Sequence, residues 1–228
     1  MNAVDTDILN YTIVAEQAVD ALAREALLDR AMGPGRRRKS SEKLRRGRRP
    51  SQGLALVAKD ERGRIVGTVR LWDVALGISP LEGEMVAKRP EGAISEGTAG
   101  APSAAAATPA AAFGGTSPSR GEGVLLLGPL AVDPSMKAAG IGSALMRNAI
   151  AEAKRLGHKA VLLVGDALYY GRFGFSAEKT GSLAMPGPYE KHRLLALELV
   201  PGALDGAGGV LRPAGRKANA ATRLPRAA

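Results

Sequence analysis

The pattern of apolar and polar positions predicts a chain of alternating strands and helices. Residues 11–15 (YTIVA) alternate and are rich in β-branched side chains, which is typical of a strand. From 17 to 32 the apolar residues recur at the spacing of one helix face, until Gly33 and Pro34 end the pattern. We expect the buried face of this helix to hold Val19, Leu22, Ala23, Ala26 and Leu27.

Two further segments have the pattern of strands. The apolar runs 54–58 and 65–72 flank the polar turn 60–64, which predicts an antiparallel hairpin. The run 124–132 is almost wholly apolar, as expected of a strand that is buried on both faces. Gly128-Pro129 interrupts this run, and because proline has no N–H for the ladder, the pair predicts a bulge with free backbone N–H groups nearby.

A glycine-containing turn, 137–143, follows the apolar run and leads into a helix that we expect to end near 156, before Gly157. The first amides of a helix lack intrahelical partners, and the helix dipole favours an anion beside them. Gly140 and Gly142 leave room for phosphate oxygens, so the turn is predicted to bind a pyrophosphate. It is not a Walker A loop, because the terminal Gly-Lys-Ser/Thr is missing. It is also not a full dinucleotide fingerprint, because Leu145 stands where the third glycine would be. The apolar stripe expected on this helix is Ile141, Ala144, Leu145 and Ala149.

Composition narrows the classes of protein and of site. The 228 residues suit one domain, and they include no cysteine and only two histidines, which disfavours disulfides, thiolate chemistry and a zinc or other metal site. The first 30 residues have no apolar core of a signal peptide, and no run is long enough to span a membrane. We therefore expect a cytoplasmic protein without a membrane partner.

The net charge of +10 is concentrated in two segments. Residues 34–50 carry +8 and residues 201–228 carry +4, so the remainder is close to neutral at −2. Three interpretations of 34–50 stay open: a solvated loop or short charged helix, a lip over the active site that attracts an anion, or nucleic-acid binding through 36–49. The last is disfavoured because no aromatic side chains are interleaved with the charges. Residues 79–122 and 201–228 are predicted to be a disordered insertion and a flexible basic tail around a single domain, 1–200.

The order of these motifs resembles the GNAT N-acetyltransferases. That family has an acyl-CoA loop with the pattern Arg/Gln-x-x-Gly-x-Gly/Ala, which 137–142 matches except that Lys137 replaces Arg or Gln. It also has a tyrosine four residues before a Gly-Phe pair, which Tyr170 and Gly174-Phe175 match after the apolar run 159–164. The resemblance covers 11–200 and implies an α/β (α+β) GNAT-like fold, with a mixed, mostly antiparallel sheet flanked by helices. It also implies a final antiparallel pair of strands, 181–184 and 193–200.

The resemblance assigns roles to individual residues. It implies that acetyl-CoA binds as co-substrate, with its pyrophosphate on the turn and its pantetheine arm along the strand. The implied cofactor-binding residues are Leu130, Ala131, Val132, Lys137, Ala138, Ala139, Gly140, Ile141, Gly142 and Ser143. The N–H of Leu130 would stabilise the oxyanion, and Tyr170 would protonate the departing thiolate, unless it is an ordinary core tyrosine. Tyr169 is interpreted as packing or as a wall of the substrate site.

The acceptor half is left open by the sequence. A general base must take a proton from the attacking amine, and Asp166 and Asp73 are the candidates nearest to the motifs. The acceptor amine can belong to a small molecule or to a protein. Two other functions stay open: a non-catalytic acyl-CoA-binding sensor of the same fold, and a basic module that binds RNA or ribosomes.

Overall fold

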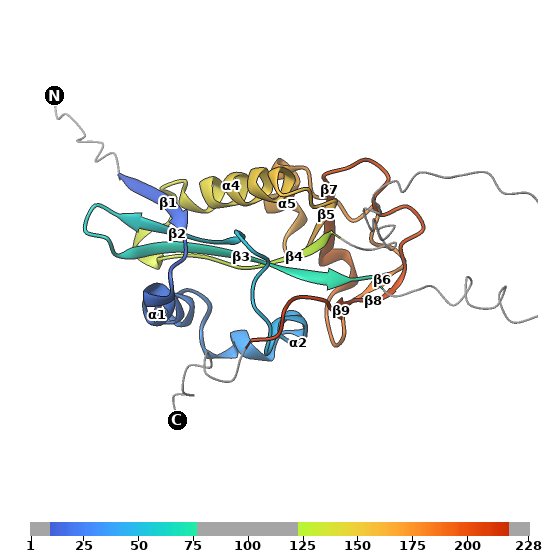
Figure 1. The fold of residues 1–228 in the computed structure, drawn as a ribbon, viewed down its shortest axis with the longest axis horizontal. Coiled ribbons are helices and arrows are strands. Elements are labelled where there is room, and N and C mark those ends of the chain that lie inside the picture. Colours follow the sequence, from blue (N-terminus) through green and yellow to red (C-terminus); the bar gives the residue numbers. More distant parts are fainter. Residues whose placement is uncertain (1–9, 77–122, 219–228) are drawn as a thin grey trace, which may run out of the picture.

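A mixed β-sheet forms the centre of the molecule (Figure 1). The computed structural model describes residues 10–76 and 123–218, to which all structural statements refer. The strand order is β1-β2-β3-β4-β5-β7, and β9 pairs with the end of β3. Among these neighbours only β4 and β5 are parallel, which confirms the mixed, mostly antiparallel sheet. The strands are β1 Tyr11–Ala15, β2 Ala55–Asp60, β3 Ile65–Ala75, β4 Val124–Val132, β5 Ala160–Val164, β7 Leu194–Glu198 and β9 Arg212–Pro213.

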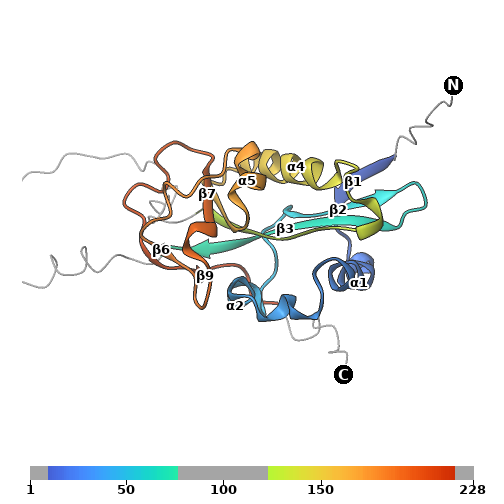
Figure 2. The same cartoon turned by 180° about the vertical axis from the view of Figure 1, so that it is seen from behind.

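Helices cover both faces of the sheet. Helix α4 (Ile141–Arg155) lies on one face, and α1 (Ala21–Met32) and α2 (Ser40–Arg45) lie on the other (Figures 1 and 2). The alternation along β4 explains how this strand serves both layers: Leu125 and Leu127 pack with α4, whereas Leu126 packs with Leu44 of α2. Helix α5 (Ala167–Tyr170) follows β5, and a separate two-stranded sheet joins β6 (Leu183–Ala184) to β8 (Gly209–Val210).

The predicted buried face of the first helix is wrong. Of its five expected residues only Leu27 is buried, whereas Val19 and Leu22 are 86% and 71% exposed. The buried face instead carries Arg24, Leu27 and Leu28. Arg24 can lie inside because its Nε is 3.2 Å from a carboxylate oxygen of Glu16, which is equally buried. The buried side of the helix is therefore the one that contains this ion pair, and the more apolar side with Val19 and Leu22 is exposed.

Two predictions about the C-terminal part also need correcting. Strand 181–184 does not pair with 193–200: β6 runs parallel to β8, while β7 is antiparallel to β5. Residues 201–218 are not a flexible tail, because Leu204 and Leu211 are buried in the core and β9 extends the sheet. The predicted insertion, 79–122, and the last ten residues lie outside the described ranges.

Candidate active site

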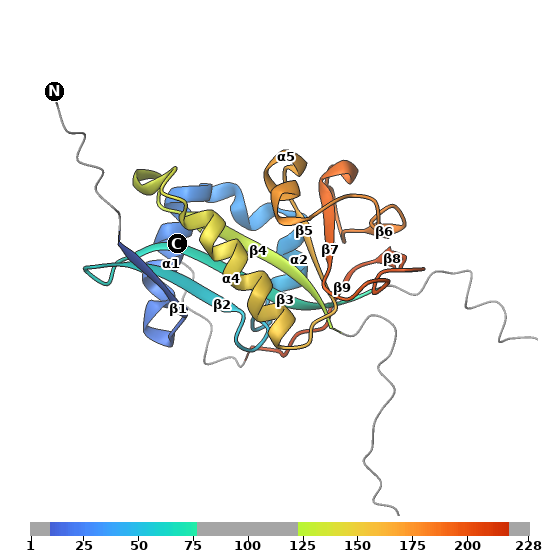
Figure 3. The same ribbon diagram turned by 90° about the horizontal axis from the view of Figure 1, so that it is seen from above.

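The strands β4 and β5 separate in the middle of the sheet (Figure 3). They pair only through residues 124–126 of β4 and 160–162 of β5, although both strands continue beyond. Opposite β3, three steps along β4 from Leu127 to Leu130 match two steps from Leu71 to Val69. One extra residue is therefore present in β4, which confirms the bulge predicted from Gly128-Pro129. The edge of β4 that faces β5 is left unpaired by the described strands after Leu126.

The glycine turn lies beside this opening and forms a pocket of about 390 Å³. Gly140 caps α4 in the left-handed conformation, with φ of 74°, and Ala138 is also left-handed, with φ of 68°. A non-glycine residue in this region is uncommon and is typical of turns under functional constraint. Because the first amides of α4 have no intrahelical partners, the pocket suits an anionic group.

Seven of the ten predicted cofactor-binding residues line this pocket. They are Val132, Lys137, Ala138, Gly140, Ile141, Gly142 and Ser143. The other three lie close in the chain but outside the lining: Leu130 and Ala139 pack against the core, and Ala131 is buried opposite Thr68 of β3. Most of the pocket lining thus comes from one short stretch of chain, 132–143.

Two pocket residues come from the tyrosine turn, and sequence analysis gave them no cofactor role. A Cβ on Gly142 would lie only 3.1 Å from the Tyr169 hydroxyl, so the glycine is what lets this ring approach the turn. Arg172 stacks on the Tyr169 ring, with 4.1 Å from its guanidinium carbon to the ring centroid, and its Nε donates to the Tyr169 carbonyl. Arg172 is therefore held as a positive charge at the pocket. The sequence signal for this contact was the position of Arg172 three residues after Tyr169.

Tyr170 packs differently from its neighbour. A Cβ on Gly165 would lie 2.1 Å from the Tyr170 ring, so the strand end must be glycine for the ring to fit. The ring also meets Tyr169 and Phe175 edge to face, at 4.9 and 6.1 Å between centroids. Burial, with Tyr169 adding to it and Arg193 opposing it, raises the pKa of Tyr170 to about 12. The hydroxyl is therefore protonated at neutral pH.

The two candidate bases lie in different places. Asp166 lies two residues after the end of β5 and caps α5, where its carboxylate accepts from the N–H of Leu168 at 2.9 Å. Asp73 lies opposite Leu125, three residues before the bulge, and its charge acts on His158. The structure thus brings Asp166 into the same turn as Tyr170 and places Asp73 toward the other end of the sheet.

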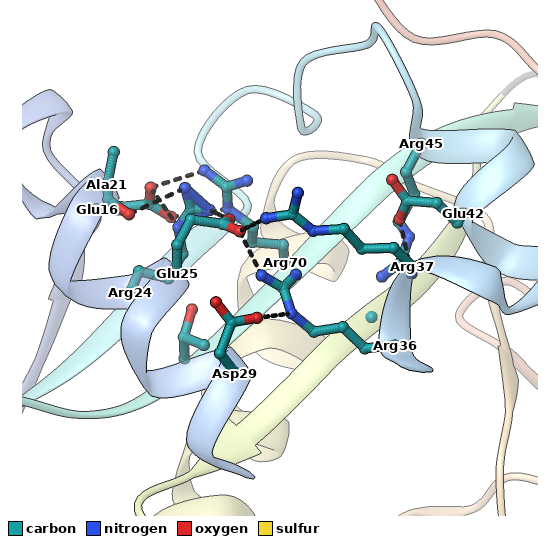
Figure 4. A network of polar contacts seen from close by, with 12 residues as sticks. Glu16, Ala21, Arg24, Glu25, Asp29, Arg36, Arg37, Glu42, Arg45 and Arg70 are labelled. Atoms are coloured by element: carbon teal, nitrogen blue, oxygen red, sulfur yellow. Dashed lines mark hydrogen bonds and ion pairs between the residues drawn. The ribbon is translucent and has the colours of Figure 1, made fainter. Parts of the chain in front are cut away.

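The basic run 34–50 is built into the fold beneath the sheet. It forms a 3-10 turn (Pro34–Arg38) and α2, and Leu44 is buried. Arg36 binds Glu25 and Asp29 at 2.5 and 2.7 Å (Figure 4). Arg48 donates to the carbonyl of Gly215 at 2.7 Å. Several of these cations are therefore neutralised within the protein.

Within residues 10–76 and 123–218, no group of three or more His, Asp or Glu side chains is placed to hold a metal ion. No helix in those ranges has the length and apolarity needed to cross a membrane.

Known proteins resemble this chain in sequence and in fold. The model of the acetyltransferase (GNAT) family matches residues 21–175. The uncharacterized N-acetyltransferase YjhQ of Escherichia coli (strain K12) is 37% identical over 71 residues, which is 30% of this chain and only 39% of that relative. A crystal structure of the GNAT family N-acetyltransferase YhbS from Escherichia coli, in complex with CoA, superposes with a TM-score of 0.61 at 22% identity. That match covers 90% of this chain and 91% of YhbS, and it shows the shared fold.

Proposed function

The chain belongs to the GNAT acetyltransferase family, and we propose that it transfers the acetyl group of acetyl-CoA to a primary amine by direct attack in a ternary complex. The observation that carries this proposal is the separation of β4 from β5 beside an anion-binding turn. The opening gives a linear ligand an unpaired strand edge, and the turn gives its phosphates a set of free amides.

The residues around the pocket fit acetyl-CoA, which supplies a thioester-activated acetyl group when bound. The amides of 138–143 would hold the pyrophosphate, with Lys137 and Arg172 as flanking charges. The unpaired edge of β4 at 130–132 would bond to the pantetheine arm. The presence of CoA in the YhbS structure supports this assignment for a chain of the same fold.

Two groups of this chain would act on the reacting atoms. Tyr170 would donate its proton to the sulfur of the leaving thiolate, and its raised pKa keeps that proton in place at neutral pH. The N–H of Leu130, just after the bulge, would donate to the carbonyl oxygen as negative charge develops on it.

The attacking amine must be neutral, so a base or a water relay must take its proton. Asp166 is the first candidate to test because it shares the α5 turn with Tyr170, and Asp73 is the second.

The test combines cofactor binding with turnover. Calorimetry should show acetyl-CoA binding to the full chain, and Arg172→Gln should weaken it by about tenfold, as expected for one lost charge-assisted contact. Arg62→Gln, which changes an exposed arginine of the β2–β3 turn, is the control. A panel of primary amines should then release CoA. Absence of binding would refute the proposal, and binding with no turnover of any amine would indicate an acyl-CoA sensor.

A further inference from the structure

Arg45, at the end of α2, is a buried cation whose hydrogen bonds are only partly satisfied. Its side chain is 10% exposed, and within residues 10–76 and 123–218 no hydrogen-bond partner reaches its Nε. Nη2 reaches Ser41 Oγ and a Glu42 oxygen, both at the long distance of 3.3 Å. Burial lowers the pKa of Arg45; Glu42 opposes this effect, whereas Arg36 and Arg70 add to it. A buried guanidinium with so little compensation favours an anion beside it.

Neighbouring arginines of the same face are paired much more tightly. Two nitrogens of Arg70 donate to the Glu16 carboxylate, at 2.6 and 2.8 Å. Arg36 binds Glu25 and Asp29 at comparable distances. Figure 4 shows Arg45 and Glu42 set apart from this connected group. The Nε of Arg24 also lacks a hydrogen bond within the described residues, but it lies 3.2 Å from Glu16, and Nη1 of Arg24 donates to Glu25 at 3.0 Å. Arg45 therefore has the longest ion-pair contact of these buried arginines, at 3.3 Å.

The position of Arg45 relates it to the proposed reaction. Its Nη1 lies 3.7 Å from the point where a Cβ on Gly128 would be, and Gly128 is the first residue of the bulge. Val124 and Leu126 face α2, and Gly128 continues their alternation. Arg45 therefore lies beside the bulge from the side of α2. Figures 1 and 2 show that α2 and α4 lie on opposite faces of the sheet.

The carbonyl of Gly128 accepts a hydrogen bond from the Trp72 side chain. Trp72 Nε1 donates to this carbonyl at 2.5 Å, and the Trp72 ring also carries the guanidinium of Arg70, 5.6 Å from its centroid. The hydrogen bonds and ion pairs of Arg45 within the described residues go to Ser41 and Glu42, and both come from Nη2, so Nη1 beside Gly128 is the nitrogen that can meet a ligand.

We infer that Arg45 binds an anionic group of the acetyl acceptor, so that the acceptor is a small amine with a carboxylate or phosphate a few bonds from its nitrogen. This inference rests on the proposed acetyltransferase function. The planar guanidinium matches both anions, since each offers two oxygens in the same geometry. The separation must be short because Arg45 lies beside the bulge and Leu130 is only two residues further along the strand.

The test uses pairs of amines that differ only in the anionic group. β-Alanine is compared with β-alaninamide, and O-phosphoethanolamine with ethanolamine, by measuring CoA release. We expect the anionic member of one pair to have a kcat/KM higher by about ten- to hundredfold, the range of a charge-assisted contact. The pair that shows the preference identifies carboxylate or phosphate as the recognised group.

Variants separate recognition from a structural role. Arg45→Met should abolish the preference while the melting temperature stays the same or rises, because a poorly compensated buried charge is replaced by an apolar chain of similar length. Arg45→Lys should retain part of the preference. Arg37→Met, which removes an arginine that is 55% exposed, should leave it unchanged.

A binding measurement covers the case in which none of the four amines turns over. Calorimetry with N-acetyl-β-alanine, N-acetyl-O-phosphoethanolamine and the matching neutral compounds should show selective binding of an anion, with and without CoA, that Arg45→Met removes. Equal use or binding of both members of each pair, absence of anion binding, or a preference that survives in Arg45→Met would overturn the inference. Unselective turnover would overturn it while leaving the proposed function intact.

Discussion

The two faces of the opening between β4 and β5 are built in different ways. On the α4 face, the pocket is lined by one continuous stretch, 132–143, together with Tyr169 and Arg172. On the α1 and α2 face, Glu16, Arg45 and Arg70 come from three separate segments: Glu16 pairs with Arg70, and Arg45 pairs with Glu42. The first face depends on backbone conformation, and the second depends on charge balance.

Removing the Tyr170 hydroxyl should have the largest effect, because the proposed mechanism uses its proton for the departing thiolate. In Tyr170→Phe we expect kcat to fall by about 10²–10⁴-fold, the usual contribution of a general acid, while acetyl-CoA affinity changes little. Tyr169→Phe is the matched control and should alter cofactor affinity more than kcat. Since the pKa of Tyr170 is raised to about 12, its ionisation should cause no loss of rate up to pH 10. Wild-type kcat in Tyr170→Phe would remove the tyrosine from the mechanism.

A glycine pair can test whether the α4 face depends on backbone. Gly140 and Gly157 flank α4, both have left-handed φ (74° and 79°), and a Cβ on either would meet no atom within 4 Å. Changing either to alanine should therefore cost about 1–2 kcal/mol of stability through backbone strain alone. Only Gly140→Ala should also weaken acetyl-CoA binding, by about tenfold, because only this turn presents its amides to the pocket.

Chemical denaturation and calorimetry on both glycine variants would check this. Equal cofactor affinity in the two would mean that the conformation of the turn does not determine binding, and the contrast between the two faces would lose its basis.

The smallest expected effect concerns His158, which lies outside both faces, and the pH dependence of stability. Burial lowers the pKa of His158 below its ordinary 6.5, although attraction to Asp73 opposes this shift. Because the unfolded chain binds the proton more readily, this group contributes stability above pH 6.5 that is lost as pH falls through the folded pKa. His158→Gln should therefore make the melting temperature fall less steeply between neutral and acidic pH.

The pH dependence of acetyl-CoA affinity serves as the control for this variant, since His158 lies at the start of β5, away from the pocket. Identical melting curves for wild type and His158→Gln across this range would contradict the shift.

The contrast between the faces also explains what the sequence could predict. The bulge, the glycine turn and most of the pocket follow from local patterns, since Gly128-Pro129 and 137–143 dictate backbone conformation within a few residues. The position of Arg45 beside Gly128 depends on packing between residues 83 positions apart, for which no local pattern exists.

The errors have the same origin. The most apolar side of α1 was expected to be buried, yet Arg24 lies inside because Glu16 on the preceding segment neutralises it. Residues 201–218 were expected to belong to a flexible basic tail, yet Leu204 and Leu211 are buried in the core. In both cases one or two long-range contacts outweighed local composition.

Residues 212–218 pair with segments from the first third of the chain, which constrains the order in which the protein can fold during synthesis. Strand β9 pairs with the end of β3. The backbones of Arg48 and Lys217 form an isolated antiparallel β-bridge, and the Arg48 side chain donates to the carbonyl of Gly215. The segment that follows α2 therefore acquires these partners only after almost all of the described chain has left the ribosome. Until then, the segment around Arg45 has been synthesised but lacks its contacts with residues 212–218.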